Sequence, residues 1–188
     1  INKGTDYFYK GEGLKTILNF INPNGNLTKD DFINYRVHKR EPLQLDFNGY
    51  NIFTNPAPSY GGTLIIFLLQ LIKNIPVKEI DIYTLIKGMN LASKVREEVC
   101  TNPNNENEIS NILSKKTFEK YLHLFKQDSI IDLAPPLNGF GATTHISILD
   151  KKGNAVSMTT TNGEGCGYII PEFGIMPNNM LGEEDLNP

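Results

Sequence analysis

One threonine in this chain stands where a single cut would give it both a nucleophile and a base. The segment Gly141-Ala142-Thr143-Thr144-His145-Ile146-Ser147 runs from a bend of small residues into an alternating pattern typical of a β-strand. If the chain were cut before Thr143, that residue would carry a hydroxyl and a free α-amine. A hydroxyl is a poor nucleophile at neutral pH, and a terminal amine is a base that the same residue can supply. The unperturbed pKa of an α-amine is about 8, close enough to neutral to accept the hydroxyl proton.

The residues around Thr143 also have a simpler interpretation. Threonine favours strands, and Thr159-Thr160-Thr161 followed by Asn162-Gly163 is typical of a strand that ends in a turn. Spacing alone therefore leaves two interpretations open, an ordinary strand and a nucleophile at the start of one.

The composition describes a globular chain and excludes some classes of function. The chain has 188 residues, 39% of them hydrophobic, and a formal net charge of −3. This length suits one domain or a domain and a part, and the charge gives no basic face for nucleic acid. The three histidines lack the spacing of metal ligands, so no metal site is expected. Cys100 and Cys166 form neither a CxxC pair nor a zinc pattern, which favours free thiols in a reducing compartment.

Neither a membrane segment nor a signal peptide is visible. The longest apolar run, Leu64 to Ile72, is interrupted by Gln70 and is far shorter than the ~20 residues of a membrane helix. The start, Ile1-Asn2-Lys3-Gly4, lacks an initiator methionine and has the look of a cut end. We therefore expect a soluble, cytoplasmic chain without a membrane partner.

The periodicity changes from helical to alternating along the chain. Helical spacing predicts helices over 11–20, 28–35, 63–75, 80–99 and 114–126, the second with a capping box and the last capped by Ser114. Alternation predicts two hairpins, one around Asn48-Gly49 and one around residues 151–154. Residues 102–108 read as a polar loop, 127–142 as an exposed linker in which a cut is tolerated, and 162–167 as a glycine-rich loop.

Several short motifs follow one another in a recognisable order. From the threonine onward they are Thr143–Ser147, Asp150–Ser157, the Thr161-Asn162 loop, and Gly174-Ile175-Met176 with Asn178-Asn179. Before it they are Asp6–Gly11, Leu27–Val37, Arg40–Leu43, Gly49-Tyr50 and Pro56–Gly62. Together they resemble the γ-glutamyltransferase family of N-terminal nucleophile hydrolases, over nearly the whole chain except about 89–138. The ending 178–188 is more similar to a side-branch of the family than to the main glutathione-degrading enzymes.

The resemblance implies an α+β fold, part of the four-layer αββα sandwich of N-terminal nucleophile hydrolases. It also implies a zymogen that cleaves itself between Ala142 and Thr143. Residues 1–142 would then be the C-terminal part of a large-subunit-like region, and 143–188 the start of a small-subunit-like region that pairs with it. Exposed edges of incomplete sheets predict that the isolated chain associates, possible homo-oligomers included. No metal or organic cofactor is implied.

The resemblance further implies roles for individual residues. Thr143 would be the nucleophile, forming an acyl-enzyme with the γ-glutamyl group of a glutathione-type amide and releasing it to water or to an acceptor amine. Thr161 matches the family threonine whose hydroxyl supports the nucleophile. Asn162 and Glu183 match residues that hold the α-amino end of the substrate, with Glu184 or Asp185 as alternatives to Glu183.

Three departures from the family pattern leave alternatives open. Met180 stands where the main branch has a glutamine that contacts the substrate, and methionine cannot supply that polarity. One residue that separates the family's threonine and asparagine is absent between Thr161 and Asn162. The family's substrate-binding arginine lies upstream of Ile1, and its serine pair and oxyanion glycines lie downstream of Pro188, so we expect the isolated chain to be weakly active or inactive. The alternatives are a catalytically inactive scaffold of the same fold and an acyl transferase acting on poly-γ-glutamate.

Overall fold

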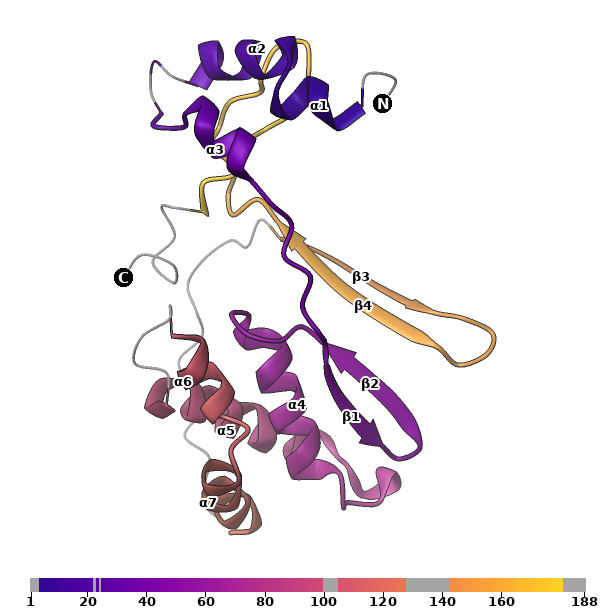
Figure 1. The fold of residues 1–188 in the computed structure, drawn as a ribbon. Coiled ribbons are helices and arrows are strands. Elements are labelled where there is room, and N and C mark those ends of the chain that lie inside the picture. Colours follow the sequence, from indigo (N-terminus) through magenta and orange to yellow (C-terminus); the bar gives the residue numbers. More distant parts are fainter. Residues whose placement is uncertain (1–3, 22, 24, 100–104, 128–142, 181–188) are drawn as a thin grey trace. The chain divides into compact units, whose positions relative to one another are not determined.

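The computed structural model of the chain describes residues 4–21, 23, 25–99, 105–127 and 143–180 (Figure 1). Two compact units make up the chain. One consists of Ile1–His38 together with Gly139–Pro188, and the other of Lys39–Asn138. We call them the split unit and the helical unit. Each contains helices and a β-hairpin, so the predicted α+β class is confirmed.

The helical unit begins with the first predicted hairpin. Strand β1 (Leu43–Phe47) pairs antiparallel with β2 (Tyr50–Thr54), from Leu43 opposite Thr54 to Phe47 opposite Tyr50. Both turn residues have positive φ, 53° at Asn48 and 85° at Gly49. This is the backbone that a two-residue turn between twisted strands requires, and an Asn-Gly pair adopts it readily.

Helices form the rest of this unit. They are α4 (Tyr60–Ile72), the 3-10 turn η1 (Val77–Glu79), α5 (Ile82–Val99), α6 (Glu106–Asn111) and α7 (Lys115–Lys126). The cap predicted at Ser114 is confirmed, because its Oγ accepts the backbone N–H of Thr117 at 3.3 Å. At the start of α5, the Asp81 carboxylate accepts the hydroxyl of Thr84 at 2.7 Å and its backbone N–H at 2.8 Å. These two hydrogen bonds lower the pKa of Asp81.

Several boundaries differ from the sequence prediction, and two of these differences have a clear physical reason. Helix α4 starts at Tyr60, so Gly61 and Gly62 lie inside the helix and not before it. A Cβ at Gly62 would collide with the backbone of Asn55, so a close approach of two backbones explains this glycine. Helix α6 occupies part of the predicted polar loop 102–108, because Asn105 caps it by accepting the backbone N–H of Asn107 at 3.1 Å.

The core of the helical unit lies among α4, α5 and α7. Its buried members are Phe67, Leu71, Ile72, Ala92, Val95, Ile112, Tyr121 and Phe125. The ring of Phe67 meets Phe118 and Tyr121 edge to face, with centroids 6.2 and 5.7 Å apart, the geometry that aromatic pairs favour. The apolar pattern around α4 predicted a buried helix. The structure confirms this for the side that carries Phe67, Leu71 and Ile72, whereas Ile65 is 49% exposed.

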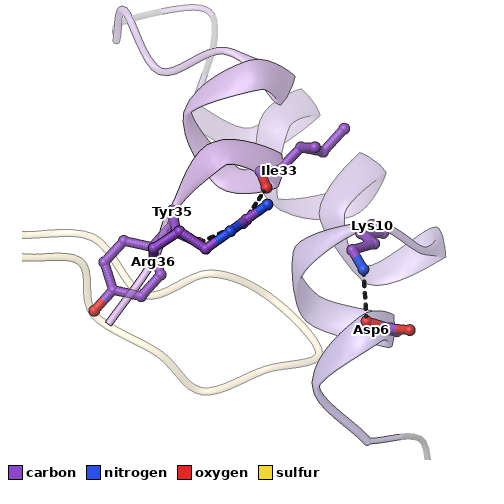
Figure 2. Close-up of polar contacts among 5 residues, drawn as sticks. All are labelled: Asp6, Lys10, Ile33, Tyr35 and Arg36. Carbon is purple, nitrogen blue, oxygen red and sulfur yellow. Dashed lines mark hydrogen bonds and ion pairs between the residues drawn. The ribbon is translucent and has the colours of Figure 1, made fainter. Parts of the chain in front are cut away.

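Three short helices open the split unit: α1 (Gly4–Tyr9), α2 (Glu12–Ile21) and α3 (Lys29–Asn34). The capping box predicted at Thr28 is confirmed, since its hydroxyl accepts the N–H of Asp31 at 3.4 Å and Asp31 accepts the N–H of Thr28 at 2.6 Å. At the other end of α3, the Arg36 guanidinium folds back and donates to the carbonyls of Ile33 and Tyr35 at 2.6 and 2.7 Å (Figure 2). Both ends of this single-turn helix are therefore closed by side chains.

The second predicted hairpin completes the split unit. Strand β3 (Thr143–Leu149) pairs antiparallel with β4 (Ala155–Thr161), as predicted. The split unit thus contains residues from both sides of the predicted cleavage point, so that point does not divide one packing unit from another. The division into 1–142 and 143–188 stays a prediction about cleavage. Apart from Gln127, the predicted linker 127–142 lies outside the described residues.

No helix within the described segments is long and apolar enough to cross a bilayer. The predicted cytoplasmic location stays a prediction.

Candidate active site

The register of β3 and β4 brings the two predicted catalytic threonines together. Thr143, the first residue of β3, lies directly opposite Thr161, the last residue of β4. Residues opposite each other on antiparallel strands share a face, with Cβ atoms about 4.5–5.5 Å apart. Both threonines are exposed in the described structure.

The loop after β4 holds the hydroxyl of Thr161 in place. Its Oγ1 accepts the backbone N–H of Gly163 at 3.0 Å, while the carbonyl of the same glycine lies at 3.4 Å. Gly163 has a positive φ of 65°, which a glycine adopts without strain. The hydrogen bond from the Gly163 N–H therefore orients the hydroxyl oxygen of Thr161. The hydroxyl proton makes only the longer contact with the Gly163 carbonyl.

Asn162 stands at the closed base of a loop, residues 162–179, which we call the Asn162 loop. Its backbone carbonyl accepts the N–H groups of Gly165 at 3.1 Å and Asn179 at 3.3 Å. The side-chain Oδ1 of Asn179 in turn accepts the N–H of Glu164 at 2.8 Å. These bonds join the two ends of the loop, so the exposed side chain of Asn162 starts from a fixed backbone next to Thr161. Met180 follows directly, its N–H bonded to Oδ1 of Asn178 at 3.1 Å.

A polar cluster that sequence reasoning missed lies beside the two threonines. His145 Nδ1 is 2.8 Å from the hydroxyl of Thr159, and His145 Nε2 is 3.1 Å from Ser147 and 2.9 Å from Ser157. The two serine hydroxyls are 3.1 Å apart. Because residues two apart on a strand share a face, this cluster continues the face that carries Thr143. The alternation of polar residues over 143–149 was a usable signal, but only pairing with β4 reveals the cluster.

The opposite face of the hairpin is apolar, and the turn at its far end is tightly closed. Ile146 and Ile148 lie opposite Met158 and Val156, all of them exposed. At the turn, the Asp150 carboxylate accepts Nδ2 of Asn154 at 2.7 Å and the N–H groups of Lys152 and Asn154 at 2.8 Å. The side-chain bond from Asn154, followed by the backbone bonds, lowers the pKa of Asp150. A turn held in this way sets the register that places Thr161 opposite Thr143.

Other predicted site residues lie outside the described parts of the chain. They are Ala142 on the far side of the predicted cleavage bond, and Glu183 with its alternatives Glu184 and Asp185. Over residues 4–21, 23, 25–99, 105–127 and 143–180, no three His, Cys, Asp or Glu side chains gather as a metal site would require. Cys166 is a free thiol in the Asn162 loop.

The sequence pattern of the Gamma-glutamyltranspeptidase family matches residues 1–187. The chain belongs to this family. It is 28% identical over 217 aligned positions to the glutathione hydrolase proenzyme of Bacillus subtilis strain 168, and 30% identical over 203 to that of Escherichia coli K12. These alignments cover 100% and 98% of this chain but 37% and 35% of the relatives. The chain therefore spans little more than a third of the curated relatives that it matches.

Solved structures of the family share its fold. A gamma-glutamyltranspeptidase from Pseudomonas nitroreducens complexed with L-DON superposes with a TM-score of 0.56 at 24% identity, over 69% of this chain and 42% of that one. The Helicobacter pylori enzyme gives a TM-score of 0.55 at 22% identity, over 69% and 39%. The predicted family is thus confirmed, and the chain shares the fold of these gamma-glutamyltranspeptidases over 69% of its length.

The names of the relatives describe the kind of protein to which this chain is similar. They are transpeptidases and glutathione hydrolases, and several are called proenzymes, which indicates precursors. A further relative, from Pseudomonas sp. strain SE83, is named an acylase proenzyme and is 26% identical over 99% of this chain. The chain therefore comes from a family of hydrolases and transferases.

Proposed function

We propose that Thr143 becomes an N-terminal nucleophile that transfers or hydrolyses γ-glutamyl groups. The observation that carries this proposal is the register that sets Thr143, at the first position of β3, opposite the loop-held hydroxyl of Thr161. Family membership supports a γ-glutamyl amide of the glutathione type as the donor. The proenzyme names of the relatives support maturation by cleavage into a large and a small subunit.

Maturation requires only groups on either side of one peptide bond. The hydroxyl oxygen of Thr143 attacks the carbonyl carbon of Ala142, the bond from that carbon to the Thr143 nitrogen breaks, and the proton that the hydroxyl loses passes to this nitrogen. Water then opens the resulting ester, which leaves a carboxylate on Ala142 and a free amine on Thr143. The hydroxyl of Thr161 would support the first step by orienting the reacting oxygen through a hydrogen bond, because its own proton is held only by the 3.4 Å contact with the Gly163 carbonyl.

Turnover then repeats the same attack on the substrate. The α-amine of Thr143 accepts the hydroxyl proton, the oxygen forms an ester with the γ-carbonyl of the donor, and the leaving amine departs with a proton. Water or an acceptor amine attacks the ester, releases the γ-glutamyl group, and returns the proton to the threonine oxygen. Asn162 and Glu183 would hold the α-ammonium group of the donor, the asparagine through its amide oxygen and the glutamate through its charge.

A scaffold without catalysis is the second candidate, and Met180 favours it. The residue belongs to the base of the Asn162 loop, where its backbone bonds to Asn178. A thioether there offers no hydrogen bond to a polar substrate. Two further donors are open. One relative is named an acylase, and an acyl transferase of this family could act on poly-γ-glutamate. The donor is therefore tested separately from the cleavage.

Cleavage is tested by sequencing the N-termini of the purified native protein that carries this sequence. We expect a second terminus that reads Thr-Thr-His-Ile-Ser. Thr143→Ala should slow its appearance by at least about 10³-fold, as removal of a nucleophile does, and Thr143→Ser should still cleave. Thr144→Ala is the matched control, because its side chain lies on the other face of β3. Cleavage of Thr143→Ala at the same bond would refute the nucleophile.

Turnover is tested with the cleaved protein on chromogenic anilides. We expect release from γ-glutamyl anilide with a burst of one equivalent, and no release from an anilide without the γ-linked glutamate. A preference for the second anilide would assign an acylase donor. Complete cleavage without release from either anilide would support the scaffold.

A further inference from the structure

The Asn162 loop ends in a tight tip, residues 170–175. The N–H of Ile170 donates to the carbonyl of Ile175 at 2.8 Å, and the N–H of Gly174 donates to the carbonyl of Ile170 at 3.1 Å. Glu172 and Gly174 both have positive φ, 68° and 62°. A non-glycine residue seldom adopts this conformation, so the tip is held in a specific shape. That shape presents Phe173, which lies between them.

Phe173 packs against the first helix of the chain. Its ring stacks on Tyr7 at 6.0 Å and meets Phe8 edge to face at 6.5 Å. Phe8 also contacts Phe32 of α3, at 6.0 Å. Ile170, at the base of the tip, is only 2% exposed and is buried like Leu14 and Ile17 of α2. The tip is therefore anchored by two residues, the buried Ile170 and the half-buried Phe173.

The surface that receives the tip is held together by its own contacts. The ring of Tyr9 stacks on Tyr35 at 5.7 Å with planes 1° apart, which ties α1 to the end of α3. Figure 2 shows Tyr35 at that end, beside Arg36, whose guanidinium closes the last turn of α3. A surface organised before docking loses little conformational entropy on binding.

The tip and the surface that receives it lie on opposite sides of the predicted cleavage point. Residues 4–38 precede it and residues 143–180 follow it, so a cut before Thr143 converts this internal packing into an interface between two chains. We propose that Phe173 and Ile170 act as a clasp that keeps the small-subunit-like region on α1–α3 after the cut. This role as a subunit interface rests on the proposed function.

The clasp also acts on the candidate site through the loop that carries it. The Cys166 N–H donates to the Pro177 carbonyl at 2.9 Å, and the bonds between Asn162 and Asn179 close the base. A Cβ at Gly165 would come within 2.5 Å of the Met176 sulfur, so the two legs of the loop lie close together. Anchoring the tip therefore restrains the base, and the base holds Asn162 next to Thr161.

The docked position of Phe173 can be measured in the uncleaved chain. The chain has no tryptophan, so a single introduced tryptophan reports on its own surroundings. In the 188-residue chain, we expect the fluorescence of Phe173→Trp to be blue-shifted and about threefold less quenched by acrylamide than that of Tyr168→Trp, at a site 64% exposed in the same loop. Adding Tyr7→Ala to the Phe173→Trp chain should shift the tryptophan emission to the red, toward that of the Tyr168→Trp chain. Equal emission of the two single-tryptophan chains would overturn the docking.

The clasp itself is tested with a cut made by an added protease. A recognition sequence replaces residues 134–139 in a Thr143→Ala background, so that the result does not depend on self-cleavage. We expect the two pieces to stay together on gel filtration, and Phe173→Ala to release the smaller piece about tenfold faster, as loss of an aromatic contact implies. Tyr168→Ala should release it at the parent rate and Phe173→Leu at an intermediate rate. Immediate separation of the parent pieces, or release that ignores Phe173→Ala, would overturn the clasp, whereas failure of self-cleavage alone would count only against the proposed function.

Discussion

In the helical unit, α4, α5 and α7 bury Phe67, Val95 and Tyr121 completely, whereas every residue of β3 and β4 in the split unit is exposed. The helices are held by packing, and the position of each side chain depends on neighbours from other elements. The hairpin is held by its ladder, its turn and the polar cluster around His145. All of these contacts are local in the hairpin.

This difference separates stability from chemistry in the described chain. In the helical unit, the free energy of folding comes mainly from buried apolar surface. The candidate catalytic residues, Thr143 and Thr161, are exposed, so few packing contacts restrain them. Their positions are set mainly by the register of β3 and β4. Substitutions in the helical core should therefore lower the unfolding free energy, whereas substitutions in the hairpin should leave it nearly unchanged.

The largest effect is expected in the helical core. Phe67→Ala removes a buried ring that contacts Phe118 and Tyr121, and should lower the unfolding free energy by about 3–5 kcal/mol. Ile148→Ala, at a site 60% exposed in β3, should change it by less than about 0.5 kcal/mol. Urea unfolding followed by circular dichroism measures both. Equal losses would break the distinction between the two regions.

A buried lysine sharpens the contrast within the helical unit. Lys87 is 7% exposed, donates to the Gln127 carbonyl at the end of α7 at 2.6 Å, and lies 5.6 Å from the centre of the Phe125 ring. Lys87→Met should cost about 1–2 kcal/mol, because it removes a charged donor from a helix end. Lys126→Met, on the exposed side of α7, serves as the control. If Lys87→Met left the unfolding free energy unchanged, only the apolar part of the lysine side chain would contribute to stability.

The phenol of Tyr121 should show its burial through pH. Burial raises the pKa of Tyr121, and its hydrogen bond to Glu98 at 2.8 Å adds to the shift. At pH 7, Tyr121→Phe should cost about 1 kcal/mol for the lost bond. Above pH 10 the unfolded phenol loses its proton before the folded one, so the native chain loses stability as pH rises. Urea midpoints from pH 7 to 11 should thus converge for the two chains, and a constant gap would contradict the raised pKa.

The smallest effect on global stability is expected in the hairpin. His145→Ala removes three contacts, to Thr159, Ser147 and Ser157, but all are exposed and local. We expect less than about 0.5 kcal/mol in global unfolding, and about 2–5-fold faster amide exchange in β3 and β4. Thr144→Ala, on the opposite face, should leave the exchange rates unchanged. A global loss as large as that of Lys87→Met would show that the hairpin is coupled to a core.

Local chemistry made much of this structure predictable. The Asn48-Gly49 turn, the cap at Ser114, and the capping box of Thr28 each depend on residues within a few positions. The existence of the second hairpin was also predictable, but its register was not. Counting outward from the predicted turn at 151–154 would pair Thr143 with Asn162, whereas the N–H of Asp150 bonds to the carbonyl of Asn154 and the tighter turn places Thr143 opposite Thr161. Helix α1 was not predicted from periodicity, since a helix of six residues is too short to show one.

Contacts between distant residues were decided only by the tertiary structure. Gly62 is needed because the backbone of Asn55 passes against α4, and Lys87 is buried because the end of α7 reaches it. Phe173 looks like one more loop residue until α1 supplies Tyr7 and Phe8. The amino-acid sequence by itself determined most of the helices and both hairpins, since their energies depend on near neighbours. The tertiary structure decided which polar groups are buried and where the Asn162 loop docks, because those energies depend on residues that only the folded chain brings together.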